Sequence, residues 1–443
     1  MTLLHPDARV IDAATGATLC RAEVDAAAEF FAAQPPGAVF ALTATELPAI
    51  ARYVAAVETG RPVALLDPDM DRAALGALLD RFAPALVTGV ADAPPAGYRA
   101  ERDVWIREAP AAPVHPDLAL LLTTSGSTGN PKLVRLSRSA VLANAESIAQ
   151  SLSLDADEVA PTTLPLFYSY GMSVLNTHLL RGATLVLERT GILQRDFWTA
   201  VREHRCTSLA AVPYQYEMLR RLRFDPAKYP SLRTLTQAGG RLRAELVSEF
   251  AAKMAAVGGR MIVMYGQTEA GPRMAALPAD RLADKLGSAG RAIPGGSFTI
   301  EDDEVVYRGP NVMMGYAESA DDLAKGDELG GVLHTEDLGR LDDEGFLFIT
   351  GRRKRMGKVF GERVNLDDVE RHLTGHGAVA AVADGDRIRV FVEGADAAQA
   401  QVVRKELASW LHTHFSGLDV RGIEALPLLP NGKIDYRTLE ASS

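Results

Sequence analysis

The sequence has little cysteine, few aromatic residues, no excess of positive charge and no long apolar run. Its two cysteines, Cys20 and Cys206, stand far apart among 443 residues, which argues against a disulfide framework or a metal site. We expect two buried thiols in a reducing compartment, the cytoplasm. A formal net charge of −10 lacks the basic field that nucleic-acid binding requires. We therefore expect no nucleic-acid partner. We also expect no membrane partner, because no apolar stretch reaches the roughly 18 residues of a membrane helix.

Length and composition indicate a globular protein with more than one domain, since 443 residues, 47% of them hydrophobic, can bury a large core. The N-terminal part alternates apolar strands and amphipathic helices, beginning with a strand at 39–42, a helix at 47–57 and a strand at 62–66. This alternation predicts an α/β fold of mostly parallel sheets flanked by helices. Short alternating segments at 298–300 and 304–307 predict an additional small β-rich subdomain.

A hydroxyl- and glycine-rich loop follows the apolar run Leu118–Leu122 and ends in a single lysine. Glycines let its backbone approach a ligand, the hydroxyls and amides donate hydrogen bonds, and Lys132 supplies a charge, so we predict a polyphosphate site. The spacing differs from G-x-x-x-x-G-K-[ST], which disfavours a kinase or GTPase. The predicted phosphate-binding residues are Thr124, Ser125, Gly126, Ser127, Thr128, Gly129 and Lys132.

Three motifs resemble those of the adenylate-forming superfamily, which includes acyl-CoA synthetases, nonribosomal-peptide adenylation domains and firefly luciferase. The loop is similar to T-S-G-[ST]-T-G-x-P-K-G, with Leu133 replacing the last glycine. Residues 265–269 match the motif Y-G-x-T-E, and residues 426–437 resemble the terminal L-P-x-x-x-x-G-K signature. The resemblance spans about residues 8 to 439. It implies a large ATP- and carboxylate-binding domain, residues 1–352, and a small mobile α+β domain, residues 353–443, which carries the catalytic lysine.

The resemblance also implies roles for individual residues in binding ATP and Mg²⁺. Tyr265 would pack on adenine, Thr268 would donate to the α-phosphate, and Glu269 would hold Mg²⁺ directly or through water. Lys433 would be the catalytic lysine of the adenylation step. Three further positions implied for adenine and ribose lie in a turn similar to G-G-[AE]-x-L: Ala238, Gly239 and Gly240. The other two are Asp337 and Arg352. The residue before Asp337 is Glu336, where relatives have glycine.

An aromatic loop at 164–171 resembles the superfamily's P-L-[FY]-H-x-x-G segment, which lines the pocket for the carboxylate substrate. Tyr168 stands where relatives usually have histidine. No aspartate occupies the position at which amino-acid-activating relatives hold the α-ammonium group, so we expect a fatty or aryl acid. The implied pocket residues are Phe167, Tyr168, Tyr170, Tyr214 and Gly266.

A basic segment at 351–358 resembles the interdomain hinge of the superfamily, and Lys354 takes the hinge position. Gly357 replaces a customary branched residue, and we expect it to add backbone freedom beside the hinge. The following segment resembles the loop that swings toward the thiol acceptor. Its implied thiol-side residues are Lys358, Gly361 and Arg363.

These observations predict an enzyme that uses ATP and Mg²⁺ to convert a carboxylic acid to acyl-AMP, releases pyrophosphate, and then transfers the acyl group to a thiol. The acceptor is either coenzyme A or the phosphopantetheine of a carrier protein, and the terminal segment favours the carrier. Two alternatives stay open. One is a stand-alone enzyme that activates amino acids, and the other is a degenerate nucleotide-binding protein without turnover.

Overall fold

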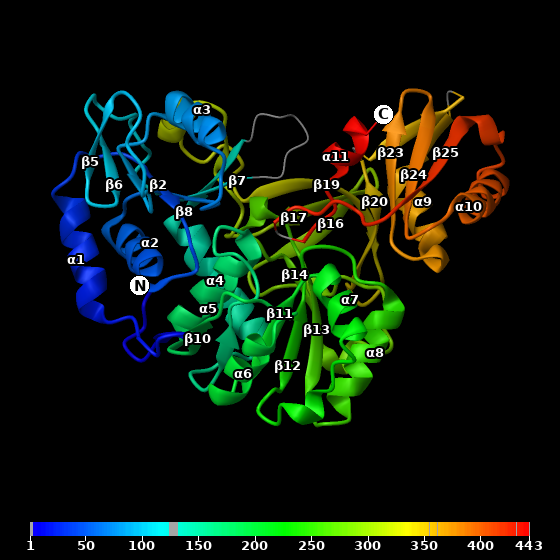
Figure 1. Cartoon of the computed structure of the whole chain (residues 1–443), viewed down its shortest axis with the longest axis horizontal. Coiled ribbons are helices and arrows are strands. Elements are labelled where there is room, and N and C mark those ends of the chain that lie inside the picture. The colour runs from blue at the N-terminus through cyan, green and yellow to red at the C-terminus, as the bar shows by residue number, and fades with distance from the viewer. Residues whose placement is uncertain (1–2, 124–131, 354, 361, 431, 443) are drawn as a thin grey trace. The chain divides into compact units, whose positions relative to one another are not determined.

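The computed structural model describes residues 3–123, 132–353, 355–360, 362–430 and 432–442 (Figure 1). The chain packs as two compact units. Unit 1 consists of Met1–Ser297 and Tyr307–Leu333, and unit 2 of Phe298–Val306 and His334–Ser443. The expected division at residue 352 stays a prediction. Among the described helices, none combines the length and apolarity needed to cross a bilayer.

An eight-stranded sheet organises the first part of unit 1. Its four central strands run parallel, with α2 (Leu47–Thr59) and α3 (Arg72–Phe82) connecting them, whereas its edge strands are antiparallel. A short turn joins the antiparallel pair β5 and β6, whereas β18 comes from a distant part of the chain to pair with β8. In sheet order the strands are β18 (Gly315–Ala317), β8 (Leu133–Ser137), β7 (Leu118–Thr123), β3 (Val63–Leu66), β2 (Val39–Leu42), β4 (Leu86–Thr88), β6 (Val104–Arg107) and β5 (Tyr98–Glu101).

A second sheet of unit 1 carries the nucleotide motifs. Its strands β11 (Ser208–Ala211), β12 (Thr234–Gln237) and β13 (Arg260–Tyr265) are parallel, so their carboxyl ends lie at one edge, where α/β proteins bind ligands. β14 (Ala275–Leu277) and β15 (Arg291–Ala292) extend it antiparallel. The helices α4 (Arg138–Leu152), α5 (Ser169–Arg181), α7 (Pro213–Arg221) and α8 (Ala244–Ala255) lie around this sheet (Figure 1).

The rest of unit 1 is a three-stranded parallel sheet with its flanking helices. β10 (Thr184–Leu187) lies between β1 (Arg9–Asp12) and β9 (Val159–Pro161). The helices α1 (Arg21–Ala32) and α6 (Arg195–Glu203) complete the helical set of this unit within the described residues.

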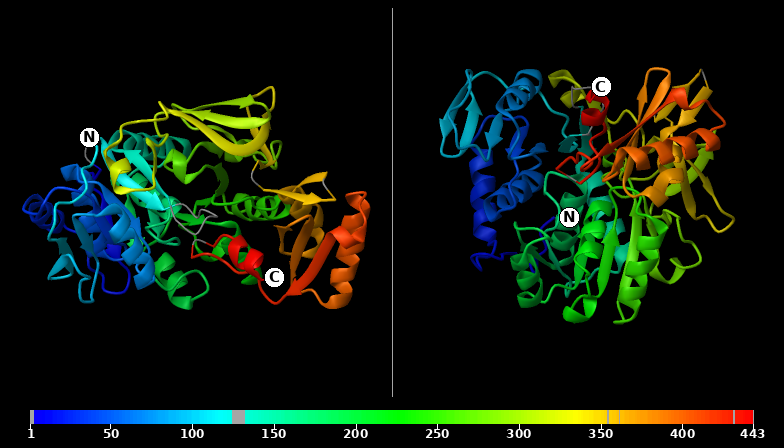
Figure 2. Two further views of the ribbon diagram at one scale, coloured as in Figure 1. Left: turned by 90° about the horizontal axis from the view of Figure 1, so that it is seen from above. Right: turned by 45° about the vertical axis from the view of Figure 1, so that its right-hand side comes forward.

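Unit 2 contains most of a four-stranded sheet, a hairpin and a small α+β layer. The sheet orders β16 (Ser297–Glu301), β17 (Glu304–Arg308), β19 (Val332–Leu341) and β20 (Leu347–Arg352). The hairpin pairs β21 (Met356–Val359) with β22 (Glu362–Asn365). In the layer, α9 (Leu366–His372), α10 (Ala397–Trp410) and α11 (Tyr436–Ala441) accompany β23 (Val379–Asp384), β24 (Arg387–Glu393) and β25 (Leu418–Ile423), and Figure 2 shows α10 packed along these strands.

Several expectations about single residues are wrong. The spacing of Leu246, Phe250 and Met254 predicts that Val257 completes the buried face of one helix, but Val257 lies beyond the end of α8 and is 41% exposed. The sequence also predicts a helix from about Ala398 to Phe415, but α10 ends at Trp410, and His412 adopts a left-handed φ of +50°. Cys20 is exposed at the start of α1, whereas Cys206 is buried, and burial raises the pKa of its thiol to about 12.

Candidate nucleotide and acid site

The turn that follows β13 carries the two residues expected at the α-phosphate and at Mg²⁺. Thr268 begins this turn, and its Oγ1 lies 3.2 Å from Oγ of Ser169, the first residue of α5. The Glu269 carboxylate accepts a hydrogen bond of 2.8 Å from the Tyr316 hydroxyl. Its backbone carbonyl accepts another from the Met313 amide at 2.9 Å. The turn is thus anchored through both side chains and through the backbone.

Lys132 lies at the start of β8 and reaches the same Tyr316. Its ammonium nitrogen is 5.5 Å from the centre of the Tyr316 ring and 2.5 Å from Oε1 of Glu318. Tyr316 therefore has a cation above its ring and a carboxylate at its hydroxyl. The other predicted phosphate ligands, residues 124–129, lie outside the described residues.

This arrangement fits a magnesium polyphosphate. The ammonium of Lys132 complements phosphate oxygens, and the Glu269 carboxylate is the hard oxygen donor that Mg²⁺ prefers. Within the described ranges, no group of three histidine, cysteine or acidic side chains could hold a metal ion by itself. A single protein carboxylate suits Mg²⁺ bound mainly by phosphates and water.

Leu133, which replaces a glycine of the phosphate signature, is part of the core. It pairs with Thr123 of β7 on one side and with Ala317 of β18 on the other, and it is fully buried. The chain directly after Lys132 is therefore a packed strand, and the backbone restriction that this substitution implies agrees with the structure.

Tyr168 and Gly239 meet at the edge of the second sheet. Gly239 has a left-handed φ of +84°, and a β carbon there would lie 2.6 Å from the Tyr168 hydroxyl. Both the backbone conformation and this close approach therefore require glycine. Burial raises the pKa of Tyr168 to about 12, although the charge of Arg273 opposes the rise. The Tyr168 hydroxyl is consequently neutral at physiological pH and offers the pocket a polar but uncharged group.

Of the residues predicted for the pocket and the adenine site, the structure gathers only some. Tyr168, Tyr170 and Ala238 share one apolar cluster with Leu164, Ala210, Val212, Ile262 and Met264. Phe167 is half-buried outside that cluster, and Tyr214 on α7 is 40% exposed. Two of the remaining predicted positions lie at the end of β13: Tyr265 is its last residue, and Gly266 follows, where a β carbon would collide with the Pro272 carbonyl. Gly240 lies three residues after the end of β12.

Sequence reasoning missed four residues of this region: Ser169, Arg273, Tyr316 and Glu318. Arg273 is 3% exposed, and its guanidinium carbon lies 4.2 Å from the centre of the Tyr170 ring. A signal for Arg273 was present, since it is an isolated basic residue four positions after the Y-G-Q-T-E motif in an otherwise apolar stretch. Tyr316 and Glu318 carry no local signal, because only the pairing of β18 with β8 brings them to Lys132.

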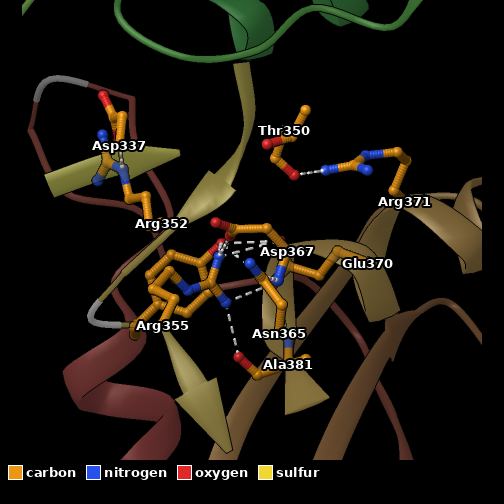
Figure 3. Close-up of polar contacts among 10 residues, drawn as sticks. Asp337, Thr350, Arg352, Arg355, Asn365, Asp367, Glu370, Arg371 and Ala381 are labelled. Atoms are coloured by element: carbon orange, nitrogen blue, oxygen red, sulfur yellow. Dashed lines mark hydrogen bonds and ion pairs between the residues drawn. The ribbon is translucent and has the colours of Figure 1, made fainter. Parts of the chain in front are cut away.

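In unit 2, the two predicted ribose ligands bind each other. Asp337 is 2% exposed on β19 and accepts a hydrogen bond of 2.8 Å from Nε of Arg352, its register partner on β20 (Figure 3). Glu336 adopts a left-handed φ of +59°, which explains why the family motif has glycine at this position. Its amide donates to the Glu304 carboxylate at 2.9 Å, and this bond helps to hold the unusual conformation.

The predicted hinge Lys354 and the thiol-side residue Gly361 lie outside the described residues. The next residue, Arg355, donates to the carboxylates of Asp367 and Glu370 and to the carbonyl of Ala381 (Figure 3). Burial acts to lower its pKa, but the bond to Glu370 and the neighbouring negative charges raise it above the ordinary arginine value. Arg355 is therefore fixed as a cation within the small α+β layer.

Contacts also link β20 with α9 across the position of Lys354. Arg371 of α9 donates to the Thr350 carbonyl (Figure 3). A β carbon on Gly351 would collide with the side chain of Asn365, the residue before α9. Both contacts join the chain before residue 354 to the chain after it.

The other thiol-side residues lie on the β21–β22 hairpin. Lys358 is exposed and pairs in register with Arg363. Gly357 pairs with Val364, and a β carbon there would come within 3.0 Å of Leu366. Its φ lies outside the left-handed region. The structure thus uses this glycine for close packing within a strand and not for the backbone freedom that we expected.

Lys433 is presented by a tight turn near the C-terminus. The Leu429 amide donates to the Lys433 carbonyl at 2.8 Å, and Gly432 supplies the left-handed φ of +76° that the turn needs. The neighbouring Ile434 packs against the apolar cluster that contains Ala380 and Phe391. The turn is therefore anchored in unit 2 while Lys433 stays half-buried; its catalytic role stays a prediction.

Comparisons with known proteins point to one enzyme family. A family model for AMP-binding enzymes matches residues 15–317. Indoleacetate–CoA ligase of Aromatoleum aromaticum is 34% identical over 69% of this chain, and feruloyl-CoA synthase of an Amycolatopsis species is 32% identical over 77%. The chain spans 63% of the first relative's length and 72% of the second's.

Solved structures share the fold at lower identity. The o-succinylbenzoate CoA synthetase of Bacillus subtilis, in complex with its acyl-adenylate intermediate, aligns with a TM-score of 0.77 at 22% identity and covers 99% of this chain and 96% of its own. ATP-bound MatB from Rhodopseudomonas palustris aligns with a TM-score of 0.79, also at 22% identity and with the same two coverages.

Proposed function

The chain belongs to the AMP-binding enzymes, and from this premise we propose that it joins ATP and a carboxylic acid into an acyl-adenylate. Pyrophosphate leaves in this first half-reaction, and a thiol then takes the acyl group from AMP. The enzyme would be an AMP-forming acid–thiol ligase that uses ATP and Mg²⁺. The names of the similar ligases support this assignment.

One observation carries the proposal: Tyr316 contacts both Lys132 and Glu269. An ammonium and a carboxylate held on one side chain provide one group for phosphate oxygens and one for Mg²⁺. Thr268, adjacent to Glu269, adds a hydroxyl donor beside them. A degenerate protein without turnover would have no need for this set, and the retention of Lys433 supports the same conclusion.

The chemical task is to bring two anions together, since a carboxylate and the α-phosphate of ATP repel each other. Lys132 and Lys433 would neutralise phosphate oxygens, and Thr268 would donate to the α-phosphate. Mg²⁺, held by Glu269, would supply further positive charge to the polyphosphate. Asp337 can accept hydrogen bonds from ribose hydroxyls once Arg352 shifts away from it. No side-chain nucleophile is required.

The acid that this chain activates would be an aryl or fatty acid. The cluster around Tyr168 and Tyr170 is apolar, and the buried cation Arg273 lies against the Tyr170 ring. A buried cation repels an α-ammonium group, so an amino acid would bind poorly. The similar indoleacetate and feruloyl enzymes are named for aryl acids, which favours the same class.

Coenzyme A is the acceptor that we propose, because both of these ligases are named for it. A phosphopantetheinyl carrier protein is the second candidate, favoured by the terminal segment at 426–437. Two cysteines that form no disulfide agree with action in the cytoplasm, where ATP and coenzyme A are both supplied.

The test is pyrophosphate release over a panel of aryl, fatty and α-amino acids, followed by addition of coenzyme A or a phosphopantetheinylated carrier to the active acid. We expect release with an aryl or fatty acid and a thioester with coenzyme A. Release with no acid, in a sample that still binds ATP in a direct binding assay, would contradict the proposal. A thioester that forms only on the carrier would replace the acceptor and leave the first half-reaction standing.

A further inference from the structure

Arg273 is a buried cation without a carboxylate partner. The segment that carries it is fixed by its backbone, because the Arg273 carbonyl accepts hydrogen bonds of 2.9 Å from the side chains of both Asn144 and Asn311. Both asparagines are 1% exposed. The Arg273 side chain therefore starts from a rigid point and extends toward α5, where it meets Ser173 and Tyr170.

The contacts of the guanidinium leave part of its hydrogen-bonding capacity unused. Nη2 donates to Oγ of Ser173 at 2.9 Å, and the guanidinium carbon lies 4.2 Å from the centre of the Tyr170 ring. Nε is buried and has no partner among the described residues. No described acidic side chain forms an ion pair with Arg273, and since arginine does not give up its proton in proteins, the charge stays.

Arg273 borders a cavity of about 30 Å³ between α4, α5 and the second sheet. This volume holds about two water molecules, or one group the size of a carboxylate. Apolar side chains such as Ile148, Ala160 and Met264 form much of its wall. Apolar walls screen charge weakly, so an anion placed beside this cation would interact with it strongly.

The other charged residues around the cavity already have hydrogen-bond or ion-pair partners. Glu158 accepts from the Thr207 hydroxyl and forms an ion pair of 3.6 Å with Arg233. Arg260 donates to the Thr234 hydroxyl at 3.1 Å and to the Leu152 carbonyl at 2.7 Å. Arg260 thus uses its Nε and a terminal nitrogen in hydrogen bonds to neutral groups, whereas the buried Nε of Arg273 has no partner within the described part of the chain.

The cavity adjoins the proposed acid pocket. Tyr170 and Ala210 belong both to the cavity wall and to the apolar cluster that contains Tyr168. Ser169, directly before Tyr170, contacts Thr268 of the proposed adenylation site. A substrate whose reacting carboxylate lies at Thr268 would therefore extend past Tyr168 and Tyr170 toward Arg273.

We propose that Arg273 and this cavity form the distal end of the acid pocket and bind the second carboxylate of a dicarboxylic acid. The inference rests on the proposed acid activation and specifies its substrate class. One carboxylate reacts with ATP, and the other forms an ion pair with the guanidinium, which uses the unpartnered Nε. A monocarboxylic acid of equal length would leave Arg273 unpaired and would bind less tightly.

The test is pyrophosphate release measured with matched pairs of acids, each a dicarboxylic acid and the analogue with a methyl group in place of the distal carboxylate. In the wild-type enzyme we expect kcat/KM for the diacid to exceed that for its analogue at least tenfold. Arg273→Met, which keeps the length of the side chain without its charge, should remove this preference through KM. Arg273→Lys should restore part of it.

Arg260→Met is the matched control, since Arg260 borders the same cavity but is already hydrogen-bonded. This control should keep the ratio between diacid and analogue. The binding readout is the rise in melting temperature with each diacid alone, expected for the wild type and absent for Arg273→Met. Wild-type preference for the methyl analogues, or an equal loss for both acids in Arg273→Met, would overturn the inference while acid activation stands. No release with any acid would instead contradict the proposed function.

Discussion

The ammonium nitrogen of Lys132 lies 2.5 Å from Oε1 of Glu318. Lys132 is the residue proposed to bind the phosphates of ATP, so Glu318 holds the position that a phosphate oxygen would take. Both side chains are substantially exposed, at 44% and 62%, and such pairs contribute at most about 1 kcal/mol. The pair is therefore strong enough to orient the lysine and weak enough for a polyphosphate to displace it.

Glu318→Gln should lower the KM for ATP by up to about fivefold, because removal of the competing carboxylate frees the ammonium of Lys132. The measurement is pyrophosphate release at increasing ATP with the acid saturating. Lys132→Met is the paired variant and should raise the same KM. A higher KM for ATP in Glu318→Gln would mean that Glu318 assists nucleotide binding and does not compete with it.

Lys433→Ala should reduce acid-dependent ATP–pyrophosphate exchange by about two to four orders of magnitude, since one charged transition-state contact supplies about 3 to 5 kcal/mol. Thioester formation from a preformed acyl-adenylate should survive. Lys405→Ala, an exposed lysine on α10, is the control and should leave exchange unchanged. Full exchange in a folded Lys433→Ala protein would remove this lysine from the mechanism.

Leu133→Gly should lower the free energy of unfolding by about 3 to 6 kcal/mol. The substitution leaves a cavity beneath two strands and adds a flexible residue to β8. Leu133→Val keeps a branched apolar side chain and should cost less than about 1.5 kcal/mol. Denaturant unfolding of both variants measures the difference. A stable Leu133→Gly protein would show that the family's glycine is compatible with this strand after all.

His178 should make unfolding stability depend on pH below neutrality. It is 4% exposed, its Nδ1 lies 2.8 Å from the Val174 carbonyl, and burial lowers its pKa from 6.5 to about 4, although this carbonyl opposes the change. The unfolded chain therefore binds the proton first, and stability present above pH 6.5 declines as the pH falls toward 4.

Between pH 7 and pH 5 this difference corresponds to about 2 kcal/mol. His178→Asn, which can keep the donor to Val174 without titrating, should lose about that much less stability than the wild type over this interval. Denaturant midpoints at both pH values measure it. An equal loss in both proteins would assign the pH dependence to other groups.

Long periodic segments were predictable from the sequence, and so were the three motifs. Strands such as 39–42 and helices such as 47–57 follow from apolar spacing, because their burial depends on neighbours in the sequence. The positions of Thr268 and Glu269 after β13 follow from a five-residue motif. Such features need no knowledge of how distant segments pair.

Features that depend on distant pairing were not predictable. Glu318 and Tyr316 reach Lys132 only because β18 adds to the edge of β8 in a particular register. The role of Gly357 was misjudged for a related reason, since its packing against Leu366 depends on the β21–β22 hairpin. Arg273 was visible as a lone basic residue, but its lack of a counter-charge is a property of the packed interior.

The contacts between β20 and α9 bear on the speed of the proposed cycle. A rotation about residue 354 would have to break the bond from Arg371 to the Thr350 carbonyl and separate Gly351 from the Asn365 side chain. Beyond that point, Arg355 binds α9 and β23 firmly, so the segment that turns would move as a rigid body. The activation barrier for exchange between the two half-reactions would therefore be set by this small contact, which lies far in sequence from the phosphate-side residues Lys132, Thr268 and Glu269.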